Sequence, residues 1–420
     1  MKDTLNKLTL SKDGTMTLTE VSAHPVAEKR TTCRACKDSN LQPVLSLGNQ
    51  YLVNFLPTLD LEAPRAPLDL MRCWTCGLLQ LGHTVHPDRL FRDFWYRSSV
   101  NQTMRDALKD VVNTGLKWHV GGTWLDIGAN DGYLISTIPA GFTTIACEPA
   151  RNFTEELHKV SDHVIADYFS ADHDILHRVG TGSCNVITSV AMFYDLDDPD
   201  RFVADIAKCL TPEGIWINQL NDAPTMLRRN AFDSICHEHL CYYDVHTLNR
   251  IYQKHGLTIL EVTYNEVNGG SIRVVAEKSG VNRGPSLIEH RNVSTREAVM
   301  FAERVTRWKQ VMGDLVTGPL VQRGPLWCYG ASTKGCVLLQ YLDQPGAFKA
   351  IADRNPAKHG TYMTGSWLPV VSEADFRAEK PPYALVLPWA FKPEFLVRER
   401  ETMDEGTVFL FPLPSIEFCL

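Results

Sequence analysis

Four cysteines near the N-terminus of this 420-residue chain form two pairs, each with two residues between its members. They are Cys33, Cys36, Cys73 and Cys76. Two such C-x2-C pairs bring four thiolates to one tetrahedral ion, which is the ligand set of a structural zinc site. His83 and His86 follow closely, but four sulfurs leave no open position for them. We therefore predict a Zn²⁺ ion that stabilises a module too small to fold alone.

A short apolar run ends in a glycine turn at residues 124–132, WLDIGANDG. Gly128 and Gly132 would let backbone amides of the turn approach a bound nucleotide closely. Glu148 ends the next β-rich run, where a carboxylate can accept hydrogen bonds from both ribose hydroxyls. This pairing, and a turn unlike G-x-G-x-x-G, favour S-adenosylmethionine over NAD. The predicted cofactor-binding residues are Asp126, Gly128, Asn130, Gly132, Glu148 and, for adenine, Asp167 and Tyr168.

Residues 236–243, CHEHLCYY, concentrate titratable side chains. His237 or His239 can act as a general base near neutral pH, and Glu238 can orient an imidazole. A metal site is disfavoured because H-E-H lacks the helical spacing of H-E-x-x-H. The alternative is a surface turn with satisfied polar groups. Tyr96, in YRSS at residues 96–99, is a further catalytic candidate, or else an aromatic anchor between domains.

Between residues 122 and 278, β-rich runs alternate with helix-like stretches, which predicts βαβ units on a parallel sheet. Asp244 is a plausible cap of one helix, and Gly256 ends it. Asn268-Gly269-Gly270 separates the last two runs and indicates an antiparallel hairpin. A parallel sheet that ends in such a hairpin is typical of class I methyltransferases.

A helix is expected over residues 295–315, and a second βα alternation follows it. In YGASTKG, Ser332 and Lys334 open a helix whose N-terminus could hold a diphosphate. An ordinary strand-to-helix turn is the alternative.

The predicted fold class is therefore α/β, a class I methyltransferase domain flanked by a zinc-binding module and a second Rossmann-like domain. We place the N-terminal extension at residues 1–30, the zinc module at 31–95, the methyltransferase domain at 96–280 and the Rossmann-like domain at 281–420. Around Asp13-Gly14 the extension could form a hairpin or remain mobile.

The composition is that of a soluble globular protein, with 44% hydrophobic and 22% charged residues. The net charge of −7 argues against a nucleic-acid or membrane partner. The polar N-terminus lacks the apolar core of a secretory signal, so we expect a cytoplasmic protein whose cysteines are thiols or metal ligands. We expect a monomer.

In order and spacing, these motifs resemble the sugar nucleotide C-methyltransferases of deoxysugar pathways, over nearly the whole chain from Thr31. The likeness rests on the two CxxC pairs, YRSS-x3-TM, LDIGANDG, HEHL-x-YY, NGGSIR, YGASTKG, DRNPAKHG and LPW. It implies a nucleotide-linked 4-keto-6-deoxyhexose that is methylated at carbon 3′ through an enolate. By the same resemblance, His239 is the base, Glu238 orients it or contacts the sugar, and Tyr96 lies beside sugar and methyl donor. His237 is a weaker catalytic candidate, and Tyr242, Ser332 and Lys334 would bind substrate.

Two positions depart from the family pattern. Cys236 stands where a tyrosine precedes HEH, which removes a phenol that could donate to an oxyanion. The histidine after the fourth strand is missing from AMFYDLDDP, where Tyr194 or Asp195 stands. These differences suggest an altered base, sugar configuration or acceptor atom.

Three other functions remain alternatives. An O- or N-methyltransferase would need neither ketone nor enolate, and a silent scaffold would bind ligands without turnover. An NAD-linked oxidoreductase is weaker, because YGASTKG lacks the full dinucleotide pattern and no acidic residue is clearly placed for a ribose.

Overall fold

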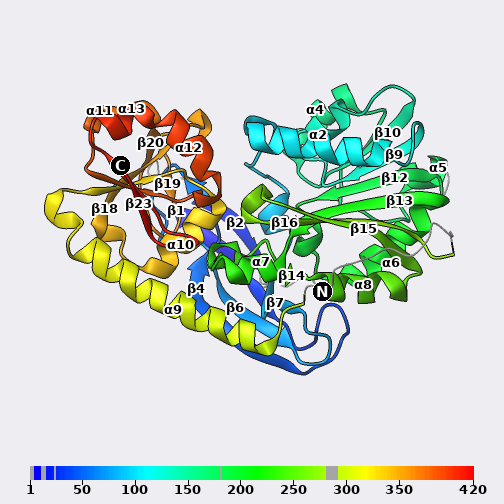
Figure 1. Cartoon of the computed structure of the whole chain (residues 1–420), viewed down its shortest axis with the longest axis horizontal. Coiled ribbons are helices and arrows are strands. Elements are labelled where there is room, and N and C mark those ends of the chain that lie inside the picture. The colour runs from blue at the N-terminus through cyan, green and yellow to red at the C-terminus, as the bar shows by residue number, and fades with distance from the viewer. Residues whose placement is uncertain (1–3, 11–15, 23–24, 180–181, 281–291) are drawn as a thin grey trace.

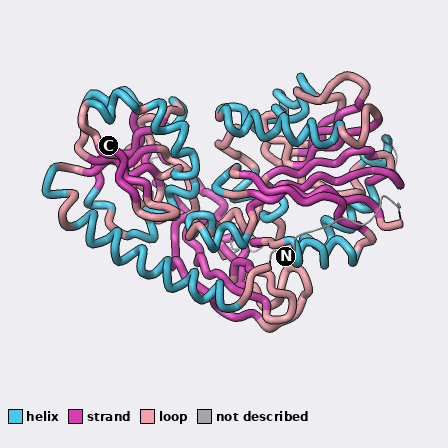
Figure 2. The backbone as a smooth tube through the Cα atoms, viewed as in Figure 1, coloured by secondary structure: helices cyan, strands magenta, loops and turns pink. Residues whose placement is uncertain are grey.

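The structure is a computed structural model that describes residues 4–10, 16–22, 25–179, 182–280 and 292–420. Three sheets dominate it (Figure 1): a seven-stranded sheet on the right, a six-stranded sheet on the left and a four-stranded sheet below and between them. Figure 2 shows helices covering the two larger sheets, whereas the central part consists mainly of strands and loops. None of the helices in these ranges is long and apolar enough to cross a membrane.

The seven-stranded sheet has the order β11-β10-β9-β12-β13-β16-β15. Its strands are β9 (Gly122–Ile127), β10 (Phe142–Cys147), β11 (His163–Ile165), β12 (Cys184–Val190), β13 (Leu210–Asn221), β15 (Leu257–Asn265) and β16 (Ser271–Lys278). Its helices are α2 (Gln102–Leu116), α3 (Tyr133–Ser136), α4 (Thr154–Val160), α5 (Asp174–Val179), α6 (Pro199–Cys209), α7 (Ala223–Arg228) and α8 (Val245–Lys254). The first five strands are parallel, and β16 pairs antiparallel with both β13 and β15. This is the predicted class I methyltransferase sheet with its terminal hairpin.

Local signals define the edges of these elements. Asp244 caps α8 through a capping box with Thr247, and Gly256 follows with φ +68°, in the left-handed region that favours glycine. Asn268 and Gly269 also have positive φ values, 55° and 89°, in the turn between β15 and β16. The predicted helix and hairpin are therefore confirmed.

The four-stranded sheet joins two distant parts of the chain. Its order is β14-β7-β6-β4, and β14 (Cys241–Tyr242) comes from the CHEHLCYY segment. The other elements of this part are β3 (Ala27–Lys29), β4 (Leu41–Tyr51), β5 (Phe55–Leu56), β6 (Arg65–Cys73), β7 (Leu79–Leu81), β8 (His83–Val85) and α1 (Asp88–Phe91). The cysteine-rich module therefore completes its sheet with a strand from the segment proposed to be catalytic.

The six-stranded sheet has the order β20-β18-β17-β21-β22-β23, with only β23 antiparallel to its neighbour. Its strands are β17 (Leu326–Tyr329), β18 (Phe348–Asp353), β20 (Val370–Ser372), β21 (Tyr383–Val386), β22 (Val408–Phe411) and β23 (Glu417–Cys419). The helices are α9 (Thr295–Thr317), α10 (Thr333–Leu342), α11 (Glu373–Glu379), α12 (Lys392–Arg398) and α13 (Arg400–Asp404), and β19 (Tyr362–Met363) pairs with β5. Helix α9 runs below this sheet toward the central module (Figure 1).

At the N-terminus, β1 (Thr4–Leu10) pairs antiparallel with β2 (Met16–Ser22), which agrees with the hairpin, one of the two alternatives for this extension. The turn residues Asp13 and Gly14 lie outside the described residues.

Two helical glycines provide a matched test of this packing. A Cβ atom on Gly115 in α2 would lie 2.4 Å from Cη2 of Trp124, which is fully buried on β9, whereas one on Gly313 in α9 meets nothing within 4 Å. We expect Gly115→Ala to lower the free energy of unfolding by about 1–3 kcal/mol. Gly313→Ala should raise it by about 0.5–1 kcal/mol. Urea unfolding of both variants measures the difference, and equal effects would contradict the packing described.

Candidate active site

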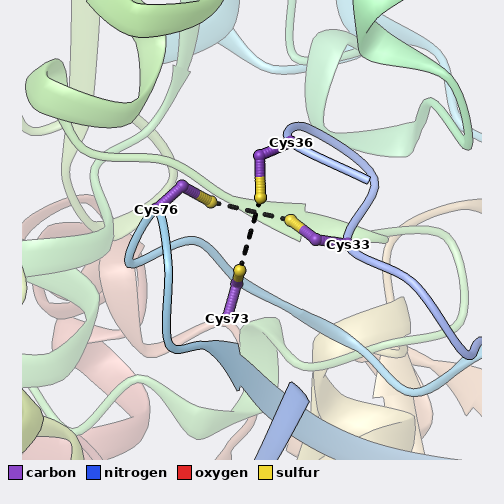
Figure 3. A group of neighbouring side chains, drawn as sticks. All are labelled: Cys33, Cys36, Cys73 and Cys76. Carbon is purple, nitrogen blue, oxygen red and sulfur yellow. Dashed lines mark hydrogen bonds between the residues drawn. The ribbon is translucent and has the colours of Figure 1, made fainter. Parts of the chain in front are cut away.

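The sulfur atoms of Cys33, Cys36, Cys73 and Cys76 all lie within 4.8 Å of one another (Figure 3). Cys33 Sγ is 3.6 Å from Cys76 Sγ, and Cys36 Sγ is 3.5 Å from Cys73 Sγ. The hydrogen bond with Cys76 lowers the pKa of Cys33 to about 4, which favours a thiolate. Four converging sulfurs fit a tetrahedral Zn²⁺ ion and complete its ligand set, so the metal would be structural.

A cavity of about 490 Å³ lies where the methyltransferase domain meets the other two parts of the chain. On the methyltransferase side, the wall includes Asp126 near the end of β9 and Gly128 and Asn130 in the turn that follows. Gly128 and Asn130 have φ values of 74° and 50°. Gly132, outside the wall, has a φ of 77° and is the N-cap residue that precedes α3. The turn is therefore bent sharply at the carboxyl end of its strand, where α/β sheets bind ligands.

The amides of this turn are used within the protein, in contrast to our expectation. Gly128 N and Ala129 N both donate to Cys147 O, at 2.9 and 3.2 Å, and Gly132 N donates to Ala129 O at 2.9 Å. The glycines therefore supply backbone conformation and leave little amide capacity for a ligand.

Glu148 lies at the end of β10 and lines the cavity. Its Oε2 accepts from Asn130 N at 2.7 Å and its Oε1 from Ala150 N at 2.9 Å. Each carboxylate oxygen retains a lone pair for a ribose hydroxyl. Asp126 Oδ1 accepts from Thr188 Oγ1 at 2.6 Å, and burial raises the pKa of Asp126 to about 7.

The two residues predicted to contact adenine, Asp167 and Tyr168, differ in whether they line the cavity. Tyr168 and its neighbour Phe169 line the cavity, whereas Asp167 is outside the lining residues. Asp167 Oδ1 instead accepts from Arg92 Nη2 at 2.9 Å, and the Arg92 guanidinium stacks over the Tyr168 ring at 4.5 Å. Asp167 is therefore placed to fix Arg92, and the two aromatic rings are better placed for adenine.

Tyr96 lines the cavity, and its segment is tied to the glycine turn. Asn130 Nδ2 donates to Tyr96 O at 3.1 Å, and Ser98 Oγ donates to Asp131 Oδ1 at 2.8 Å. Burial, together with the charge of Asp131, raises the pKa of the Tyr96 phenol to about 12. The phenol therefore stays protonated and can donate a hydrogen bond into the cavity.

His237, Glu238 and His239 line the opposite wall. His239 Nδ1 lies 3.0 Å from Ser234 O and so carries the proton, which leaves the Nε2 lone pair free to accept one. The Tyr194 ring packs on this imidazole with a centroid distance of 4.2 Å. Burial and the nearby Lys334 charge lower the pKa of His239 to about 3. The hydrogen bond that orients this imidazole is accepted by the carbonyl oxygen of Ser234 rather than by Glu238.

Four buried polar atoms on the cavity-lining residues have no hydrogen-bond partner among the described residues. They are Asp195 Oδ1, Asp233 Oδ1, His237 Nδ1 and Glu238 Oε2. Burial raises the pKa of Glu238, and burial with the Glu238 charge raises the pKa of Asp195 well above its usual value. The cavity therefore offers a polar ligand unpartnered acceptor atoms and, at Asp195, a carboxyl group whose protonated form is favoured.

The C-terminal part supplies Ser332, Lys334 and Trp389 to the wall. Lys334 Nζ donates to Asn268 O at 2.9 Å, and Trp389 Nε1 donates to Asp233 Oδ2 at 2.7 Å. Ser332 caps α10 by accepting from Gly335 N at 3.1 Å. These contacts hold the N-terminus of α10 against the methyltransferase domain.

Tyr242 lies outside the lining residues and is buried in β14, so it is not placed to bind substrate. An acidic residue, Asp353, does end β18 beside the YGAS turn, contrary to our expectation. Its two oxygens accept from Ala331 N at 2.7 Å and Asn355 N at 2.8 Å. Asp233 and Asn268 were missed as site residues, although Asn268 opens the NGGSIR motif and Asp233 lies three residues before Cys236.

Family models match the chain in three consecutive regions. Residues 33–91 match a zinc binding domain, residues 96–262 a methyltransferase domain, and residues 266–414 the C-methyltransferase C-terminal domain. The chain is thus a class I S-adenosylmethionine-dependent methyltransferase with an N-terminal zinc-binding domain and a C-terminal domain of the C-methyltransferase type.

The chain is 27% identical to C-methyltransferase NovU of Streptomyces niveus over 401 residues, which cover 91% of this chain and 95% of NovU. Among solved structures, PH0226 of Pyrococcus horikoshii matches with a TM-score of 0.36 and 12% identity, over 46% of this chain and 98% of that one. Magnesium protoporphyrin IX methyltransferase of Synechocystis matches with a TM-score of 0.33 and 12% identity, over 43% and 85%.

Glu148 provides a direct test of the cofactor half of the cavity. We expect Glu148→Gln to weaken adenosylmethionine binding about 10- to 100-fold, because a hydrogen bond to a charged group contributes about 1.5–3 kcal/mol. Isothermal titration calorimetry measures the Kd, with Glu155→Gln, an exposed neighbour on α4, as the control. Unchanged affinity in Glu148→Gln would remove Glu148 from the cofactor site.

Proposed function

We propose that this enzyme methylates carbon 3′ of a nucleotide-linked 4-keto-6-deoxyhexose, in the biosynthesis of a branched deoxysugar. The observation that carries the proposal is one cavity lined by the strand ends of the methyltransferase sheet, by residues 236–240 and by the N-terminus of α10. The similarity to NovU and to the C-methyltransferase C-terminal domain supports carbon as the acceptor.

A 4′-ketone acidifies the C–H bond at carbon 3′. His239 Nε2 is the proposed base, because burial keeps this imidazole neutral and Ser234 O holds the other nitrogen protonated. When bound, adenosylmethionine supplies an electrophilic methyl group on a sulfonium. Carbon 3′ loses its proton to His239 and forms a bond to the methyl carbon, while the methyl–sulfur bond breaks.

Negative charge develops on the ketone oxygen as the proton leaves. Cys236 replaces the family tyrosine, and burial raises its thiol pKa well above the usual value, so it is a weak donor. Asp195 is better placed to compensate, because it has an unpartnered buried oxygen and a pKa raised well above its usual value. A protonated carboxyl group in an apolar site can donate to an oxyanion.

Ser332 and Lys334 are the proposed anchors for the diphosphate. Lys334 is the lysine among the cavity-lining residues, and α10, ten residues long, presents its N-terminus there. A helix N-terminus and an ammonium group both favour a phosphate ligand.

The main test is product analysis with methyl-labelled adenosylmethionine and nucleotide sugars that carry or lack a 4-keto group. We expect labelled methyl on carbon 3′ of keto sugars alone, identified by mass spectrometry and NMR. His239→Asn should lower kcat about 10²- to 10⁴-fold while adenosylmethionine still binds. His246→Asn, exposed on α8, is the control. Label on oxygen or nitrogen, or on non-keto sugars, would replace this proposal with O- or N-methylation.

The dependence of kcat/KM on pH tests the two proton-holding groups. With a His239 pKa of about 3, the base form is present throughout the neutral range, so no loss of rate is expected near pH 6.5. The pKa of Asp195 is raised well above its usual value, so its carboxyl group keeps its proton to higher pH and loses it as pH rises, and the rate should then fall on the alkaline side.

The Asp195→Asn variant has no such proton to lose, and we expect the alkaline fall in kcat/KM to flatten in it. Glu238→Gln removes a negative charge that raises the pKa of Asp195, so the alkaline fall should move to lower pH in that variant. An acid limb centred near pH 6.5, or an alkaline limb unchanged in both variants, would contradict these assignments.

A further inference from the structure

The backbone of the catalytic segment is held by the zinc-binding module. Cys241 and Tyr242 in β14 pair antiparallel with Gln80 and Leu79 in β7. Leu81 N donates to Leu240 O at 2.9 Å. These bonds fix the chain immediately after His239.

The zinc module also contacts His237 directly, and the segment that it pairs with contacts the loop that carries Tyr194. His237 Nε2 donates to Ala66 O of β6 at 2.9 Å. Leu240 N donates to Tyr194 O at 2.8 Å, and Tyr194 packs on His239. The position of the proposed base therefore depends on two loops, both of which contact the zinc module.

Gln80 links this strand pairing to a zinc ligand. Its side chain is fully buried, and Nε2 donates to Cys33 Sγ at 3.2 Å. Its Oε1 accepts from Arg34 N at 3.0 Å, while its backbone pairs with Cys241. One residue thus spans from the metal site to the strand that follows His239.

Arg34, between Cys33 and Cys36, makes a second link. Its guanidinium is fully buried, and it donates to Leu81 O at 2.5 Å and to Thr84 Oγ1 at 2.6 Å. Its Nε donates to Asp197 Oδ1 at 3.1 Å, and Asp197 lines the cavity two residues after Asp195. Loss of a partner from a buried guanidinium group is strongly destabilising. The Cys33–Cys36 segment and the loop that carries Asp197 therefore have to keep these contacts.

We propose that Gln80 and Arg34 are positioning residues that make the geometry of residues 236–243 depend on the zinc site. The metal then has a role beyond folding its own module, because its ligand geometry sets where Cys33 Sγ and the Arg34 backbone lie. The importance for catalysis rests on the proposed function, but the positioning itself can be measured without any substrate.

Asp197→Asn and Gln80→Met test the two links without altering a cysteine. Hydrogen exchange of the full-length protein should become faster in peptides covering residues 236–243, on the order of tenfold, with little change at residues 122–132. Zinc content and the Kd for adenosylmethionine should stay as in the parent protein. Lys37→Ala is the matched control, since the Lys37–Asp198 ion pair spans the same contact but is exposed on both sides.

Zinc removal with a chelator should accelerate exchange of residues 236–243 likewise, while adenosylmethionine still binds. The ¹⁵N signals of His239 report whether its Nδ1–H tautomer is lost. Unchanged exchange at residues 236–243 in both variants and after zinc removal would overturn the proposal, and so would an equal effect in Lys37→Ala. If exchange responds as expected but no sugar is methylated, the positioning role stands and the proposed function fails.

Discussion

The backbone of residues 236–243 has to find hydrogen-bond partners outside the methyltransferase sheet, and it finds them on β7 of the zinc module. Buried N–H and C=O groups are costly to leave unpaired, so this pairing constrains where the module can lie. It also fixes one wall of the cavity, because the cavity-lining residues His237 and His239 come shortly before the paired strand β14. A small metal-stabilised sheet is a suitable support, since its own core is too small to tolerate much deformation without the metal.

Burial then determines the chemistry that the cavity can perform. The same loss of solvation lowers the pKa of His239 and raises the pKa of Glu238 and Asp195, because the neutral form is favoured in each case. The result is a neutral base beside a carboxyl group, that of Asp195, which keeps its proton to a higher pH than it would in water. An enolate needs this combination: a group that takes a proton from carbon, and donors that stabilise the oxygen.

Local patterns were sufficient to predict much of the fold. The β-rich runs between residues 122 and 278 correspond to the strands of the seven-stranded sheet, and the Asn268-Gly269-Gly270 hairpin closes it. The four cysteines converge because each C-x2-C pair already brings two sulfurs together. These features depend on residues near one another in sequence, where spacing and turn chemistry carry the information.

The composition of the cavity depends on contacts that no local pattern contains. Asp233 becomes part of the wall because Trp389, 156 residues away, donates to its carboxylate. Tyr242 shares the HEHL-x-YY motif with His239 but lies outside the cavity, because strand alternation and its pairing with Leu79 decide the direction of its side chain. Arg34 shows the same limit, since nothing between two cysteines signals a buried guanidinium that meets Asp197. A motif therefore names the residues of a site more reliably than their roles, which are decided by the partners that the tertiary fold brings to each side chain.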